Sequence, residues 1–257
     1  MAGSGARSSS RGPGAAPGAE RGGRQADLFG DAPGGRGAGG PGARSGDPVR
    51  PAVEAPVHDP WLAGLAARLP PGLRFGTSSW GFPGWSGLVY DGAHREAQLA
   101  RHGLGAYARH PLLRAVGVDR GFYAPVPEPD FERYAASVPD DFRFLLKAHA
   151  ALTQVPGSPP PPYLAGVPPA FLDVEHARRA VIEPARRALG TKLGAVLFQF
   201  SPLGPRVLRH RERLLERLRA FLDALPAGVA YAVEFRDREM FGPDYDALLA
   251  ATGAVHG

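Results

Sequence analysis

Hydrophobic and polar residues alternate with two different periods along the chain from about residue 57 onward. Six short apolar segments have the period of two that is typical of β-strands. They cover residues 73–78, 115–120, 143–149, 195–200 and 231–236, and a last one begins near residue 254. Between them, apolar residues recur at helical spacing, at 131–137, 174–189, 205–225 and 245–251. This alternation predicts a parallel sheet whose strands are joined by right-handed helical crossovers.

Such a sheet either stays open and doubly wound or closes into a (β/α)8 barrel. No Gly-x-Gly-x-x-Gly motif follows the first strand, which disfavours the dinucleotide-binding form of the open sheet. Several strands end in polar residues, as they do in barrels, where the carboxyl ends of the strands form the active face. We therefore expect a TIM-barrel-like α/β fold. About six of the eight βα units are recognisable, so we expect an incomplete barrel that is truncated at the C-terminus.

Strand alternation predicts which polar side chains point into the barrel. In the stretch YAVEFRD, residues 231–237, the apolar residues share one face, so Glu234 and Arg236 point to the other face. The same argument on three further strands completes the inward set, which is Asp119, Lys147, His149, Gln199, Glu234 and Arg236. Further candidates for substrate binding lie beside the strand ends and are Arg120, Tyr123, Trp80, Ser78 and Thr77.

This polar cluster has a structural and a functional interpretation. The charges can simply neutralise one another, but buried ion pairs add little stability and apolar side chains fill a barrel more simply. We therefore favour a catalytic site formed by Glu234, Lys147 and Asp119. Glu234 would act as general acid or base, while Lys147 and Arg236 would bind an anion or a developing negative charge. The expected substrate is a small anion or a polyol.

Other chemistries find less support in the sequence. The chain contains no Cys, and its 8 His include no His-x-x-x-His pair, so we expect no metal site. There is no Gly-x-Ser-x-Gly elbow, and the segment GTSS at 76–79 lacks the Gly-Lys ending of a P-loop. We accordingly expect no cofactor.

A proline-rich segment, QVPGSPPPPYLAGVPPA at 154–170, follows the third strand. Prolines stiffen it toward an extended conformation. The segment begins at the same end of the barrel at which the polar cluster lies. It is therefore either a cover for the site or a tolerated insertion at the surface.

The first 56 residues consist mainly of Gly, Pro, Ala and Arg in no periodic order. Such a segment buries too little apolar surface to offset its chain entropy, so we expect a disordered tail at 1–56 and a folded domain at 57–257. The chain has no apolar run of about 18 residues and its start lacks the apolar core of a secretory signal. We expect no membrane span and a cytoplasmic location.

One short segment in this tail resembles a partner-binding peptide. Gln25-Ala26-Asp27-Leu28-Phe29 is similar to the peptide by which many bacterial DNA-repair and replication proteins bind the sliding clamp. Gln25, Leu28 and Phe29 would be the anchors, and a stray apolar pair is the alternative. The net charge of +5 permits an anionic partner such as DNA, although codon bias also explains it.

The clamp interpretation predicts the result of a pull-down with a bacterial sliding clamp. The full-length chain should be captured, and the double variant Leu28→Ala/Phe29→Ala should not, because it lacks both apolar anchors. Equal capture of the two proteins, or capture of neither, would remove the support for this motif.

Five motifs occur in an order and spacing that closely resemble the YecE-like family, also called domain of unknown function 72. They are GTSSWGFPGWSGLVY (76–90), VGVDRGFYAPVP (116–127), DFRFLLKAHAALT (141–153), LGAVLFQFSP (193–202) and YAVEFRD (231–237). The resemblance covers about residues 73–257 and implies a TIM-barrel fold without implying a function.

The chain departs from this resemblance at two positions. Members of the family commonly carry Glu where Gly117 stands and Asn where Asp119 stands. If the chemistry of the family uses that glutamate, this chain is altered or inactive. Three functions therefore stay open: an acid–base enzyme, a DNA-associated nuclease-like protein recruited by the clamp, and a non-catalytic binding module.

Overall fold

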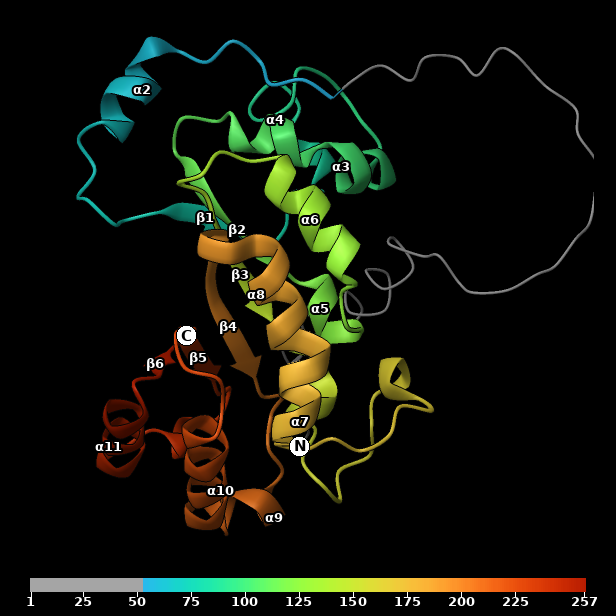
Figure 1. The fold of residues 1–257 in the computed structure, drawn as a ribbon, viewed down its shortest axis with the longest axis vertical. Coiled ribbons are helices and arrows are strands. Elements are labelled where there is room, and N and C mark those ends of the chain that lie inside the picture. Colours follow the sequence, from blue (N-terminus) through green and yellow to red (C-terminus); the bar gives the residue numbers. More distant parts are fainter. Residues whose placement is uncertain (1–52) are drawn as a thin grey trace, which may run out of the picture.

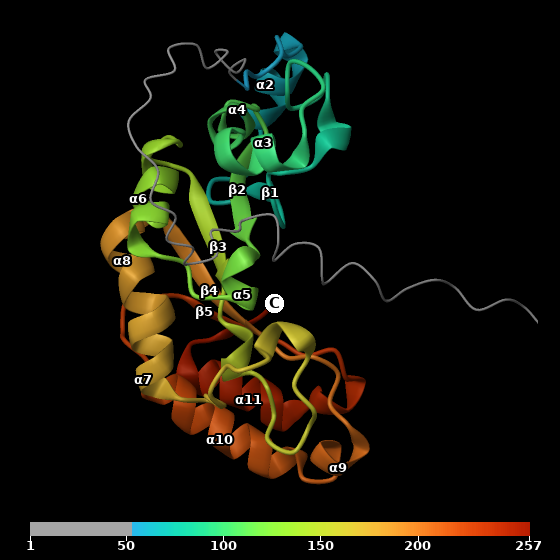
Figure 2. The same ribbon diagram turned by 90° about the vertical axis from the view of Figure 1, so that its right-hand side faces the viewer.

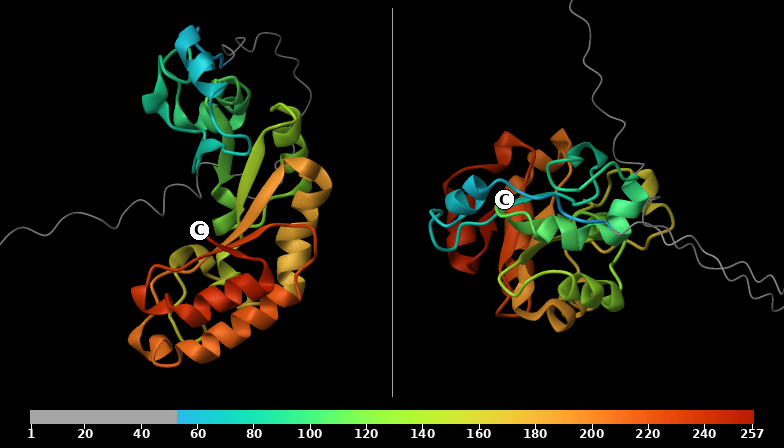
Figure 3. Two further views of the ribbon diagram at one scale, coloured as in Figure 1. Left: turned by 90° about the vertical axis from the view of Figure 1, so that its left-hand side faces the viewer. Right: turned by 90° about the horizontal axis from the view of Figure 1, so that it is seen from above.

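Six parallel strands form one sheet in the computed structural model, which describes residues 53–257 (Figure 1). All six predicted strands are confirmed. They are β1 (Phe75–Thr77), β2 (Leu113–Val118), β3 (Arg143–Lys147), β4 (Leu193–Gln199), β5 (Tyr231–Glu234) and β6 (Val255–His256). Each strand pairs with the next in sequence, from β1 to β6. A doubly wound sheet would reverse its strand order, so this order excludes that fold, and the sheet curls into a half-barrel (Figure 3).

Helices connect the strands and confirm the predicted alternation. The α-helices are α2 (Pro60–Ala66), α3 (Glu96–His102), α4 (Leu104–Ala108), α5 (Arg120–Tyr123), α6 (Glu128–Ala136), α7 (Val174–Ala177), α8 (Glu183–Leu189), α9 (Pro205–Leu208), α10 (Arg211–Asp223) and α11 (Pro243–Thr252). The sequence pattern did not predict α3 and α4, because each is short and Gly103 separates them. Within residues 53–257, no helix is both long and apolar enough to cross a membrane.

Short turns of other helical types complete the chain. The 3-10 turns are η1 (Pro83–Trp85), η2 (Ala150–Leu152), η3 (Pro162–Leu164), η5 (Gly190–Lys192) and η6 (Arg238–Met240). The predicted helix at 174–189 is continuous except for a π-helical segment, η4 (Arg178–Ile182), between α7 and α8. Pro184 follows this segment and has no amide hydrogen to donate to the carbonyl of Ala180, so the helix widens there.

The core lies between the outer face of the sheet and the helices. Tyr134 of α6 stacks on Phe144 of β3, with ring centroids 6.3 Å apart, and Phe221 of α10 packs on Phe198 of β4 at 5.1 Å. Helices α6 and α8 lie side by side on this face (Figure 1). On the inner, concave face, Leu145 is exposed. Leu197 and Ala232 on the same face are buried, so this face is exposed at β3 and covered at β4 and β5.

Candidate functional site at the carboxyl ends of the strands

A cavity of about 230 Å³ lies where β2, β3, β4 and β5 end. Its walls combine charged, amide and aromatic side chains, and its lining residues are Asp119, Phe122, Tyr123, Lys147, Gln199, Phe200, Ser201, Pro202 and Arg236. Five of the predicted site residues are in this set: Asp119, Tyr123, Lys147, Gln199 and Arg236. The structure therefore brings together side chains that are far apart in sequence, because parallel strands end at the same edge of the sheet.

Asp119 and Lys147 form an ion pair on one side of the cavity. The Nζ atom of Lys147 lies 3.1 Å from Oδ1 of Asp119, and both side chains are largely buried. Oδ1 is buried and makes no hydrogen bond of good geometry among the described residues. The attraction of the ammonium group is therefore what offsets the desolvation of this carboxylate.

Gly121 allows α5 to approach the end of β3 closely. A Cβ atom at this position would lie 2.5 Å from the carbonyl oxygen of Lys147. The close approach brings Tyr123 of α5 to the cavity beside Asp119. Burial raises the pKa of the Tyr123 hydroxyl, and the negative charge of Asp119 adds to this effect. Tyr123 therefore offers a protonated hydroxyl at neutral pH.

Glu234 lies next to this cavity and is held by two donors. The register of β4 and β5 pairs Gln199 with Glu234, and Nε2 of Gln199 donates to Oε1 of Glu234 at 3.3 Å. Nη2 of Arg236 lies 2.7 Å from the same oxygen. The Arg236 side chain is 55% exposed, whereas that of Glu234 is 18% exposed. The guanidinium group thus both contacts Glu234 and remains open to a ligand.

His149 differs from its prediction, because the structure places it against α7 and not in the cavity. Its side chain is buried at 3% exposure, and its Nδ1 lies 3.0 Å from Nε2 of His176. The strand ends at Lys147, so strand alternation no longer holds two residues later. Burial and, to a smaller extent, the positive charge that His176 can carry lower the pKa of His149 to about 4.

Arg120 and Trp80 also lie away from the cavity lining. Arg120 is the first residue of α5, and its guanidinium contacts Asp130 of α6 at 2.7 Å and the hydroxyl of Tyr134 at 3.0 Å. Trp80 is a core residue that packs edge-on against Tyr134 and donates to the carbonyl of Ala100. Trp80, a candidate for substrate binding from the sequence, is therefore packed in the core and not exposed to the cavity.

Thr77 and Ser78, at the end of β1, are not among the cavity-lining residues either. The hydroxyl of Thr77 lies 2.9 Å from that of Tyr107 and donates to the carbonyl of Ser79 at 2.7 Å. These bonds fix the end of β1 to α4. The structure thus gives Thr77 a structural contact that the local sequence pattern does not reveal, and its predicted role in substrate binding stays a prediction.

The backbone of Ser78 explains why a glycine stands at position 117. A Cβ atom on Gly117 would lie 2.8 Å from the carbonyl oxygen of Ser78. A larger side chain here would require the end of β1 to move. The glutamate that the family resemblance leads us to expect therefore has no space in this structure, and the carboxylate at this end of β2 is that of Asp119, the residue after the strand.

Several residues near the cavity were not predicted from the sequence. Phe122 and Ser201 line it, and Tyr163 of η3 packs on both Phe122 and Tyr123. Tyr163 comes from the proline-rich segment. The segment follows β3, and this position indicates that it lies near the site. In a segment of this length, however, the sequence does not show which side chain points toward the site.

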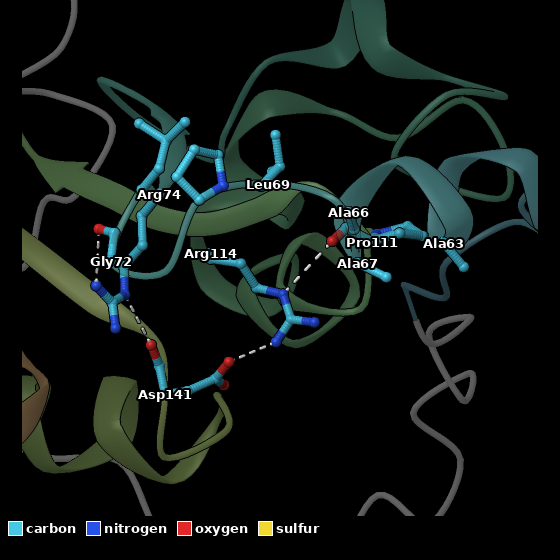
Figure 4. Close-up of a pocket in the computed structure, with 11 residues that line it drawn as sticks. Ala63, Ala66, Ala67, Leu69, Gly72, Arg74, Pro111, Arg114 and Asp141 are labelled. Carbon is cyan, nitrogen blue, oxygen red and sulfur yellow. Dashed lines mark hydrogen bonds and ion pairs between the residues drawn. The ribbon is translucent and has the colours of Figure 1, made fainter.

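A second cavity, of about 390 Å³, lies at the opposite, amino ends of the strands (Figure 4). Its polar groups are already bonded within the chain. Arg114 pairs with Asp141 at 2.6 Å, and Arg74 donates to the carbonyls of Asp141 and Gly72, both at 3.2 Å. In barrels this end contributes stability and not catalysis. We therefore place the candidate site at the carboxyl ends.

Two other expectations concern residues or groups outside this site. Gln25, Leu28 and Phe29 lie outside the described residues, so clamp binding stays a prediction. Among residues 53–257, no three His, Asp or Glu side chains are grouped in a way that could hold a metal ion.

Comparison with known proteins identifies one family. The family model described as "Protein of unknown function DUF72" matches residues 74–256. Among solved structures, a DUF72 family protein from Thermotoga maritima is 24% identical, with 70% of this chain and 62% of that chain covered and a TM-score of 0.46. A DUF72 family protein from Enterococcus faecalis is 18% identical, with 71% and 59% covered and a TM-score of 0.42.

The search of curated proteins finds no match. The chain spans about three fifths of the length of the solved structures that it matches. The family model covers well over half of the chain and includes all six strands. The chain therefore belongs to the DUF72 family.

Proposed function

We propose that this protein is an enzyme that transfers protons on a small anionic or polyol substrate, without a metal ion, at the carboxyl ends of its strands. One observation carries the proposal: two pairs of opposite charge, Asp119–Lys147 and Glu234–Arg236, adjoin a single cavity. Convergent polar groups in a concave site are the usual signature of a binding or active site.

Glu234 is the group we assign to proton transfer. A general acid or base must be held in place and still reach the substrate. Gln199 and Arg236 both contact Oε1 of Glu234, which fixes the carboxylate at the edge of the cavity. Proton transfer by a group positioned in this way typically contributes about 10²- to 10⁴-fold to a rate.

Lys147 and Arg236 are the groups we assign to anion binding. They enter from β3 and from the segment after β5, so their charges reach the cavity from different strands. The structural alternative is that each cation only neutralises its own carboxylate. The exposure of Arg236 favours a ligand-binding role, because an exposed pair adds little stability to the fold.

Replacement of Arg236 by Gln should weaken binding of inorganic phosphate to the full-length protein by about tenfold or more, since a charge-assisted bond is lost. Isothermal titration calorimetry measures this. Arg238→Gln is the matched control, because Arg238 is exposed, two residues away, and absent from the cavity lining. Equal affinities of the two variants would contradict the assignment of Arg236.

A screen in deuterated water tests the proton-transfer chemistry directly. The protein is incubated with a panel of small carboxylates, phosphorylated sugars and polyols, and NMR follows turnover and the exchange of carbon-bound hydrogen for deuterium. The proposal expects exchange or turnover with at least one compound. Binding without either result would favour the non-catalytic module, which the glycine at position 117 also favours.

A further inference from the structure

Three aromatic rings form a cluster on one side of the candidate site. Phe122 and Tyr123 of α5 are in edge-to-face contact, with ring centroids 5.5 Å apart. Tyr163 of η3 packs on Tyr123 at 5.2 Å and on Phe122 at 5.8 Å. Phe122 and Tyr123 line the cavity, so the cluster forms an aromatic wall whose outer support is Tyr163.

Tyr163 is held firmly by the proline-rich segment. This segment shares a small core with η2, in which Ala151, Leu164 and Ala170 are buried and Phe122 and Tyr163 pack against them. It lies beside α5 (yellow in Figure 2). Burial raises the pKa of the Tyr163 hydroxyl, and the side chain of Ser201, which lines the cavity, partly opposes this effect. The segment is therefore attached to the site by packing, which favours its role as part of the site over a surface insertion.

The cavity thus has two chemically different sides. The aromatic wall can pack against a ligand that has an apolar ring surface, while Lys147 and Arg236 supply positive charge. The volume of about 230 Å³ corresponds to roughly eight water molecules at about 30 Å³ each. That space accepts one ring with one charged substituent.

We infer that the substrate is a single-ring compound with one anionic group, whose ring packs on Tyr123 while the anion meets Arg236 and Lys147. Aromatic side chains favour offset or edge-on packing of rings, and such pairs contribute beyond their buried area. Tyr123 is the contact residue. Tyr163 is a positioning residue that acts through Tyr123. The inference rests on the proposed function and names its substrate class.

Isothermal titration calorimetry of the full-length protein with four probes tests this inference. The probes are inorganic phosphate, glycerol 3-phosphate as an acyclic ester, phenyl phosphate and glucose 6-phosphate. At least one cyclic ester should bind about tenfold more tightly than glycerol 3-phosphate. The preferred ester then distinguishes an aromatic from a sugar ring.

Two variants separate the ring contribution from the anion contribution. Tyr123→Leu should reduce the preference for the cyclic ester over glycerol 3-phosphate to within about twofold, with inorganic phosphate titrated against the same variant as the reference. Tyr163→Leu should reduce the same preference, and Tyr163→Phe should restore most of it, because the ring that supports Tyr123 is retained. Circular dichroism confirms that each variant is folded, and Tyr163→Leu replaces Tyr123→Leu if the latter does not fold.

The outcomes distinguish this inference from the proposed function. Equal affinities of the wild type for cyclic and acyclic esters would overturn the inference and leave the anion site intact. An unchanged preference in both Tyr123→Leu and Tyr163→Leu would also overturn it. If no phosphate compound binds, the anion site of the proposed function fails together with the inference.

Discussion

Replacement of Glu234 by Gln is expected to lower turnover by about 10²- to 10⁴-fold, on the substrate that the deuterium screen identifies. Glutamine has nearly the same shape as glutamate, and its carbonyl oxygen can still accept from Gln199 and Arg236. It cannot take up or release a proton in this role. The loss should appear in kcat, because the groups assigned to anion binding are unchanged.

The stability of this variant should change little, by about 1 kcal/mol or less. The ion pair with Arg236 is lost, but the guanidinium is more than half exposed and water replaces much of the interaction. Glu216→Gln on α10 is a matched control, because Glu216 is exposed on a helix remote from the cavity lining. Turnover of Glu234→Gln that equals the wild type would rule out the assigned role.

The free energy of unfolding should fall by about 3 kcal/mol as the pH is lowered from 6.5 to 4, through His149 alone. Burial lowers the pKa of His149 to about 4 in the folded protein, whereas the unfolded chain titrates near 6.5. Between these values the unfolded state binds more protons, so acid favours unfolding. The stabilisation is therefore complete above pH 6.5 and is lost as the pH falls toward 4.

Urea unfolding, followed by circular dichroism at several pH values, measures this effect. The variant His149→Gln should be less stable than the wild type at pH 7 but should lose less stability on acidification, since glutamine does not titrate. His210→Gln is the control, because His210 is an exposed residue at the start of α10. The same pH dependence in wild type and His149→Gln would contradict the prediction.

The strands and most of the site lining could be predicted because they follow from local rules. Each strand was recognised by a period of two, which is a property of adjacent residues. Within a strand, the same period assigned Lys147, Gln199 and Glu234 to the polar face. In the structure, Lys147 and Gln199 line one cavity, and Glu234 contacts Gln199 beside that cavity. This is because the parallel register places residues of the same face next to one another on neighbouring strands.

The rule failed where a strand ended earlier than its apolar pattern. β3 ends at Lys147, so the position of His149 is decided by η2 and by its contact with His176. Arg120 is the first residue of α5 and not the last residue of a strand, and its guanidinium contacts α6. Beyond the last paired residue the period of two no longer fixes the direction of a side chain: the expectation holds for Arg236, which lines the cavity, and not for His149.

By itself, the sequence determined the fold class, the number of strands in the described part and the alternation that separates the core from the polar side chains. These depend on neighbours along the chain. Only the tertiary structure decided that Tyr163 supports Tyr123, that Trp80 is a core residue and that the Ser78 backbone leaves no space for a side chain at Gly117. Such contacts join residues from different strands and loops, and their distances are set by how the sheet curls and how closely helices and loops pack on it.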